Sequence, residues 1–99
     1  ITLAEVNRHP EVFVGMRVSL TGTVVSLSAD HDSMHLFDGS SRAMINVSLD
    51  SLKRSERRAL LLAPVNRLSV FGRLNLDHGQ MVLRAEKIEP VARLLVASR

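Results

Sequence analysis

Apolar and polar residues alternate along two long stretches of the chain. From Met16 to Val24 and from Leu68 to Leu76, apolar residues or glycine stand at every second position, and the residues between them are mostly polar. A period of two is typical of a strand with one buried and one exposed face. We therefore predict long strands over 16–27 and 67–76, and we expect Met16 and Leu76 to belong to the buried faces.

Three shorter strands are predicted from the same pattern: Met34–Asp38, Ala43–Ser48 and Met81–Ile88. The first two are separated by hairpin chemistry, because Gly39 can adopt a positive φ. The segment Asp77–Gln80 contains His-Gly and is predicted to form a tight turn before the last strand.

The N-terminus carries a helix signal. Thr2 and Glu5 match a capping box, in which each side chain accepts a hydrogen bond from the backbone amide of the other residue. This pattern predicts a short helix from Leu3 to about Arg8. Pro10 should stop it, since the residue before a proline disfavours the helical conformation, and Glu11–Gly15 is predicted to be a connector.

A second helix is predicted between the third and fourth strands. Asp50 offers an N-cap oxygen, the apolar residues from Ser51 to Leu62 recur near the helical period, and Pro64 ends the pattern. Basic residues occupy much of the remaining surface of this helix: Lys53, Arg54, Arg57 and Arg58. They form either a phosphate-contacting face or an ordinary solvated face.

A third helix is predicted after the last strand. Pro90 suits a first helical turn, and Val91, Leu94 and Leu95 then form one apolar stripe. The stripe either docks on a partner or packs back on its own barrel.

The order of elements is helix, three strands, helix, two strands, helix. This is the order of the OB-fold, a five-stranded β-barrel in which the helix between strands three and four plugs one end. We therefore predict an all-β OB-fold barrel with a short N-terminal helix and a C-terminal helix. The 99 residues fit a single domain spanning 1–99.

Composition narrows the function classes. The formal net charge is +3, with 13 basic and 10 acidic residues, and the chain lacks cysteine, so neither a disulfide nor a cysteine–zinc site can form. Aromatic residues make up 3% of the chain, with no Trp or Tyr. Proteins that bind single strands usually stack bases on aromatic side chains, and this chain offers Phe13, Phe37 and Phe71 for that purpose.

Several segments together resemble the small OB-fold subunits of RPA-like complexes. The matching segments are Val14–Val24 for the first strand, Leu36–Gly39 for the turn after the second, Val70–Leu74 for the fourth, and Met81–Ile88 with Val91–Leu95 for the last strand and helix. Ile45–Leu52 and Phe71–Leu76 are more similar to the smallest subunit of the telomere-capping CST complex than to the smallest subunit of RPA.

The resemblance implies a non-catalytic subunit. Such a subunit stabilises a larger OB-fold partner, partly through its last helix, which here contains Val91, Leu94 and Leu95. The partner complex, rather than the subunit alone, binds single-stranded DNA. The implied location is the nucleus, at the telomere, with general replication and repair as the alternative if the RPA likeness is the correct one.

The OB-fold groove lies across strands two and three. Here its outer face should carry His35, Phe37, Met44 and Asn46, with Arg42 nearby. Together with other outward arginines, the candidate nucleic-acid-binding residues are Arg17, His35, Phe37, Arg42, Arg73 and Arg84. The alternative is that these positions are ordinary strand exteriors or are covered by protein.

Motifs for catalysis or cofactor binding are missing from the sequence. His31, Asp32 and His35 are close together but fit a polar turn better than a metal site. We expect no enzyme activity, no cofactor or metal, no small-molecule substrate and no membrane span. Two alternative functions stay open: an autonomous module that binds single-stranded DNA or RNA, and a protein-binding OB domain in a repair or RNA-processing assembly.

Overall fold

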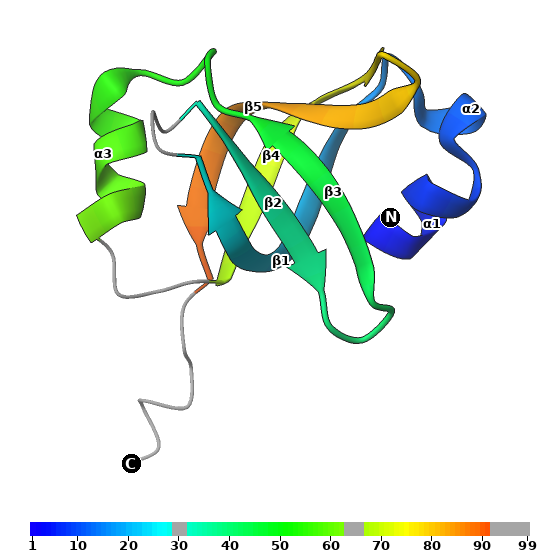
Figure 1. Cartoon of the computed structure of the whole chain (residues 1–99), viewed down its shortest axis with the longest axis horizontal. Coiled ribbons are helices and arrows are strands. Elements are labelled where there is room, and N and C mark those ends of the chain that lie inside the picture. Colours follow the sequence, from blue (N-terminus) through cyan, green and yellow to red (C-terminus); the bar gives the residue numbers. More distant parts are fainter. Residues whose placement is uncertain (29–31, 63–66, 92–99) are drawn as a thin grey trace.

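The computed structural model describes residues 1–28, 32–62 and 67–91. Eight elements follow one another along the chain (Figure 1): α1 (Leu3–Arg8), α2 (Pro10–Phe13), β1 (Arg17–Leu27), β2 (Ser33–Asp38), β3 (Ala43–Ser48), α3 (Arg54–Leu62), β4 (Arg67–Asp77) and β5 (Gln80–Pro90).

The five strands form a closed barrel in the order β1-β2-β3-β5-β4, with β4 returning to β1. β3 and β5 run parallel, and the other neighbours are antiparallel. β1 closes the barrel because its first half pairs with β4 and its second half pairs with β2. The pairing of β1 with β2 contains a bulge between Val24 and Ser26. The predicted OB-fold barrel is confirmed.

The core contains the inward residues of all five strands. Two further contributions come from α1, whose Leu3 and Val6 are 2% and 0% exposed. The remaining core residues are Val18, Leu20, Met34, Leu36, Ala43, Ile45, Val47, Leu49, Leu52, Leu68, Val70, Leu74, Leu83 and Ala85. α1 therefore belongs to the barrel and is held in place by burial of its apolar side.

The capping box is confirmed: the Glu5 amide donates to Thr2 Oγ1 at 3.2 Å and the Thr2 amide donates to Glu5 Oε1 at 2.8 Å. The predicted connector after Pro10 is instead the short helix α2. Proline stands at its first position, where its fixed φ suits a helical turn and its missing N–H costs nothing.

Met16 and Leu76 are not buried, contrary to expectation; they are 46% and 55% exposed. The pairing of β1 with β4 ends at Arg17 and Arg73. Beyond that point the Leu74 amide still donates to the Met16 carbonyl at 2.9 Å, and Leu76 pairs with Met81 of β5. The two side chains nevertheless lie at an end of the barrel that leaves them open to solvent.

Gly39 does not supply the positive φ of the β2–β3 hairpin; Arg42 does, at 60°. The β4–β5 turn agrees with the prediction, with positive φ at His78 and Gly79, as a two-residue hairpin turn requires.

α3 begins at Arg54, and Asp50 does not cap it. Asp50 Oδ1 accepts from Ser48 Oγ at 2.9 Å instead. Leu49 and Leu52 are 0% and 4% exposed, and the Leu52 amide donates to the Leu49 carbonyl. Because both leucines enter the core, the chain keeps a turn there and the helix starts later.

The predicted helix does not begin at Pro90. Pro90 pairs with Leu68 as part of β5, and the Val91 amide donates to the Arg67 carbonyl at 3.0 Å. Leu94 and Leu95 lie outside the described residues. No helix in the part of the chain that the structure describes is long and apolar enough to cross a membrane.

Candidate functional site

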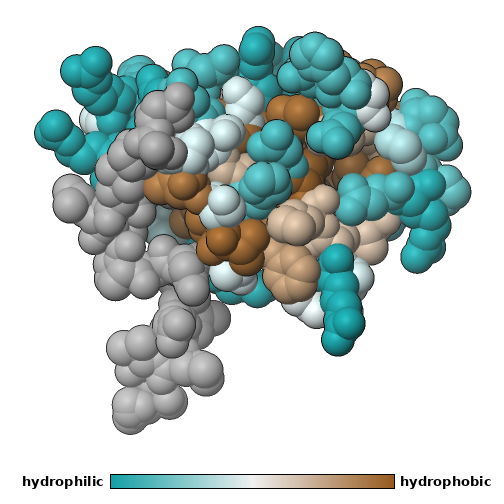
Figure 2. All heavy atoms as spheres, viewed as in Figure 1, coloured by the Kyte–Doolittle hydropathy of each residue, from teal (hydrophilic) through white to brown (hydrophobic). Residues whose placement is uncertain are grey.

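The outer face of β2 and β3 carries the predicted groove residues. Met34 and Leu36 point into the core, 1% and 0% exposed, so the alternate residues of β2 point outward. His35 lies opposite Asn46, and Phe37 opposite Met44. Figure 2 shows apolar patches over this side of the molecule, interrupted by hydrophilic residues.

The six predicted nucleic-acid-binding residues do not form one site. His35 and Phe37 share the outer face of β2, and Arg42 stands at the adjacent hairpin. The other three form a row across β1, β4 and β5, because Arg17 is opposite Arg73 and Arg73 is opposite Arg84. We call Arg17, Arg73 and Arg84 the arginine row. At the β5 end of the row, Arg84 lies opposite Ser48 of β3.

Each guanidinium of the arginine row already has a partner within the chain. Arg17 Nε lies 3.2 Å from a carboxylate oxygen of Glu86, and Arg84 Nε lies 3.8 Å from Asp50 Oδ1. Arg73 Nη1 donates to the Gly15 carbonyl at 2.9 Å. Acidic neighbours reduce the attraction of this face for phosphate, so the row is a weak candidate for strand binding.

Arg57, on the predicted basic face of α3, also points to an internal partner: its Nη1 lies 2.9 Å from Asp32 Oδ1. This contact joins α3 to the start of β2. The other three basic residues of the face, Lys53, Arg54 and Arg58, are exposed, which agrees with either of the predicted alternatives.

Asp38 holds the β2–β3 hairpin together. Its carboxylate accepts from the Ser40 hydroxyl at 2.7 Å, the Ser40 amide at 3.1 Å and the Ser41 hydroxyl at 3.0 Å. These hydrogen bonds hold the pKa of Asp38 below its ordinary value. The hairpin that presents Arg42 beside the groove is consequently ordered by its own side chains.

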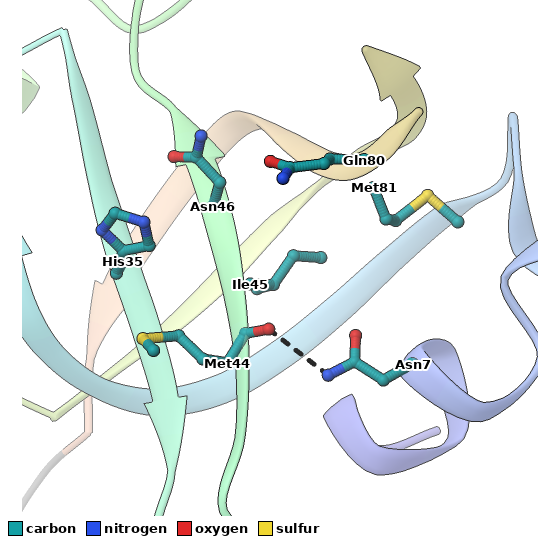
Figure 3. A pocket seen from close by; sticks show the side chains of 7 residues that line it. All are labelled: Asn7, His35, Met44, Ile45, Asn46, Gln80 and Met81. Carbon is teal, nitrogen blue, oxygen red and sulfur yellow. Dashed lines mark hydrogen bonds between the residues drawn. The ribbon is translucent and has the colours of Figure 1, made fainter. Parts of the chain in front are cut away.

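A pocket of about 310 Å³ opens on the groove (Figure 3). Its lining comes from four elements: Asn7 of α1, His35 of β2, Met44, Ile45 and Asn46 of β3, and Gln80 and Met81 at the start of β5. Three of these residues, His35, Met44 and Asn46, were predicted to lie in the groove. The apolar spacing of Leu3 and Val6 could have indicated that α1 docks, but not that it brings Asn7 to β3.

The predicted apolar stripe is represented here by Val91 alone, which is half-buried just after β5. Among the residues that the structure describes, no group of three or more His, Asp or Glu side chains could hold a metal ion. The chemistry available in the groove is hydrogen bonding and apolar contact.

No protein-family model and no curated protein matches the chain. Solved structures do match. A chain of the S. pombe Stn1–Ten1 complex is similar with a TM-score of 0.71 and 19% identity, over 97% of this chain and 79% of that one.

Two further structures agree with this likeness. A chain of U. maydis replication protein A bound to ssDNA gives a TM-score of 0.63 and 16% identity, over 92% and 78% of the two chains. The E. coli hypothetical protein ygiW gives 0.66 and 20%, over 92% and 88%. At these identities the likeness is one of fold, and the chain has the OB-fold.

Proposed function

We propose that this chain is a non-catalytic OB-fold subunit of an RPA-like complex that binds single-stranded DNA. In this proposal it stabilises a larger OB-fold partner, and the complex protects chromosome ends in the nucleus. Support comes from the sequence resemblance to small RPA-like subunits and from the structural likeness to chains of the Stn1–Ten1 complex and of replication protein A.

The observation that carries the proposal is the poor stacking surface of the groove. Phe37 is the groove's aromatic residue among those described, and it is half-buried, while Phe71 lies on the β4 exterior beside the arginine row. One stacked base contributes about 1–3 kcal/mol, whereas a micromolar complex needs about 8 kcal/mol. The groove alone is too weak for tight strand binding, so a partner must supply most of the affinity.

The partner contact is assigned to the segment that follows β5, with Val91, Leu94 and Leu95 as its apolar residues. The segment follows directly after β5, and its first residue, Val91, donates its backbone amide to the Arg67 carbonyl at the start of β4. An apolar stripe on a partner-binding segment would be covered in the complex and open in the isolated chain.

A tagged pull-down from the native cell, followed by mass spectrometry, tests the proposal. A larger OB-fold protein recovered at near-equal amount is expected, and its identity separates telomere capping from general replication. Changing Leu94 and Leu95 to Asp should abolish recovery. Val12→Asp is the matched control, because Val12 is 59% exposed and belongs to α2 rather than to that segment, and this variant should retain the partner. Recovery of nucleic acid without a stoichiometric protein overturns the proposal.

A second candidate function is an autonomous module that binds single-stranded nucleic acid. The pocket beside the groove favours it, since it gives the isolated chain a place for a ligand. Binding of the isolated chain to labelled oligonucleotides, measured between about 50 and 200 mM salt, distinguishes the two: an autonomous groove binder loses affinity steeply over that range.

A further inference from the structure

The pocket beside the groove combines an apolar floor with a polar margin. Ile45 forms the floor and is 3% exposed. In Figure 3, Met44 and Met81 lie on opposite sides of Ile45, and the amide of Gln80 points toward that of Asn46. Flexible thioether side chains adapt to the faces of a flat ligand. Two methionines therefore offer apolar contacts to a planar molecule, and the amides offer hydrogen bonds to its edge.

The polar groups of the pocket are available to a ligand. Within the described part of the chain, the side chains of His35, Asn46 and Gln80 make no hydrogen bond. Asn7 Nδ2 donates to the Met44 carbonyl at 3.3 Å, which fixes the orientation of the amide and leaves its oxygen free to accept. Four polar side chains thus converge on one small site without satisfying each other.

The lining contains no Asp, Glu, Lys or Arg. A phosphate or an ammonium group would find no countercharge there, and a purely apolar ligand would leave the amides without partners. The volume, about 310 Å³, is at the lower end of ligand sites, which span roughly 300–1,000 Å³. A neutral, flat, hydrogen-bonding heterocycle meets all three conditions.

We propose that this pocket holds one unstacked nucleobase of the bound strand and selects adenine through the amides of Asn46 and Gln80. The proposal rests on the proposed role in a single-strand-binding complex. An Asn or Gln amide presents a donor beside an acceptor, which matches adenine. The usual partners of guanine are Arg and Lys, and those of cytosine are Glu and Asp. The lining contains none of these four.

In this proposal, affinity for the strand and preference for one base come from different parts of the complex. The partner and the wider groove bind the strand, and the pocket decides which base is preferred at one position. Because Asn7 comes from α1, the site is complete only while α1 is docked on the barrel. This role would be compatible with a groove that has little stacking surface of its own.

The first test uses two labelled oligonucleotides at low salt: an all-thymine strand and the same strand with one central adenine. The probe protein is the purified chain, alone and with its recovered partner. We expect the single adenine to raise affinity by about five- to one-hundred-fold. Gln80→Ala should remove the preference, so that the two strands bind with equal affinity. Asn46→Asp should transfer the preference to a third strand with one central cytosine, whose amino group donates. Asn75→Ala is the matched control, an outward asparagine of β4 outside the pocket.

The second test reads the pocket directly. The chain has four methionines, and the methyl NMR signals of Met44 and Met81 should shift when deoxyadenosine is added. Met34, buried in the core, and Met16, at the barrel end, should not shift. Equal binding of both oligonucleotides overturns the adenine pocket while leaving the proposed function intact, and binding of neither overturns both. Methyl shifts induced by a partner protein but not by deoxyadenosine also overturn the pocket proposal.

Discussion

The backbone of β4 at Gly72 lies directly against the backbone carbonyl of Arg84 in β5, with no room for a side chain between them. The approach is produced by a bulge: Phe71 pairs with Lys87 and Gly72 with Ala85, so Glu86 is an extra residue on β5. Bulges increase the local twist of a strand pair and bend it. A barrel needs such bends to close, and here glycine permits one.

We expect Gly72→Ala to lower the free energy of unfolding by about 3 kcal/mol. The new Cβ would collide with the Arg84 carbonyl oxygen, and a backbone atom cannot rotate away as a side chain can. Relief requires β4 and β5 to separate at their closest point. Urea denaturation measures the change.

Gly39→Ala is the control for this prediction. A Cβ at Gly39 would lie 3.7 Å from Phe37 Cε2, an ordinary contact. Its φ is not positive, so alanine fits the backbone. We expect a change within about 0.5 kcal/mol, and equal losses for the two variants would contradict the steric explanation.

Much of the barrel was predictable from the sequence because strand periodicity is a local property. Ala43–Ser48 was predicted with the bounds that the structure has. The β4–β5 turn followed from its residues as well, since its backbone conformation is set by adjacent residues. The start of α3 was predicted wrongly because a local capping signal competed with burial in the core. Leu49 and Leu52 are buried, so the helix starts later and Asp50 does not cap it.

The candidate site was predictable only in part. Alternation showed that Phe37 and Arg73 point outward, but not that they lie on different faces of a closed barrel. That depends on strand order and register, which long-range pairing decides. Asn7 is the strongest example, because it reaches β3 from a six-residue helix that is docked through the burial of Leu3 and Val6.

We expect Asp38 to make the free energy of unfolding depend on pH in the acid range. Hydrogen bonds from the Ser40 hydroxyl, the Ser40 amide and the Ser41 hydroxyl favour its ionised form, so its pKa in the folded state is below the ordinary 3.8. A lowered folded pKa contributes stability that is present above pH 3.8 and is lost as pH falls toward the folded value. We expect unfolding measured from about pH 5 to about pH 2 to show this loss. Asp38→Asn should flatten the curve below pH 3.8, and an unchanged curve would exclude Asp38 as its source.

Thr2→Ala tests whether α1 is part of the cooperative unit. The substitution removes the acceptor for the Glu5 amide, and we expect a loss of about 1 kcal/mol. Because Leu3 and Val6 are in the core, the loss should appear in global unfolding rather than as local fraying. Thr2→Ser keeps the hydroxyl and should keep the stability. Exchange of the α1 amides without any change in the global transition would show that α1 unfolds by itself.

We expect Arg42 to contribute to the salt dependence of strand binding in the groove. It stands two residues before Met44, and within the described residues its side chain has no hydrogen bond or ion pair, unlike Arg17 with Glu86. A cation that contacts one phosphate of a single strand changes the slope of log K against log salt by about 0.7. Arg42→Asn, which tolerates the φ of 60°, should reduce the slope by that amount and weaken all strands alike.

Arg17→Asn serves as the comparison for Arg42, measured by the same salt titration with the purified chain and its partner. Glu86 already neutralises Arg17 at 3.2 Å, so its removal should leave the slope unchanged. If Arg17→Asn lowers the slope and Arg42→Asn does not, the strand follows the arginine row across β1, β4 and β5 rather than the groove over β2 and β3. The groove lies on β2 and β3, and the arginine row lies on β1, β4 and β5. One pair of variants therefore decides which of the two surfaces the nucleic acid contacts.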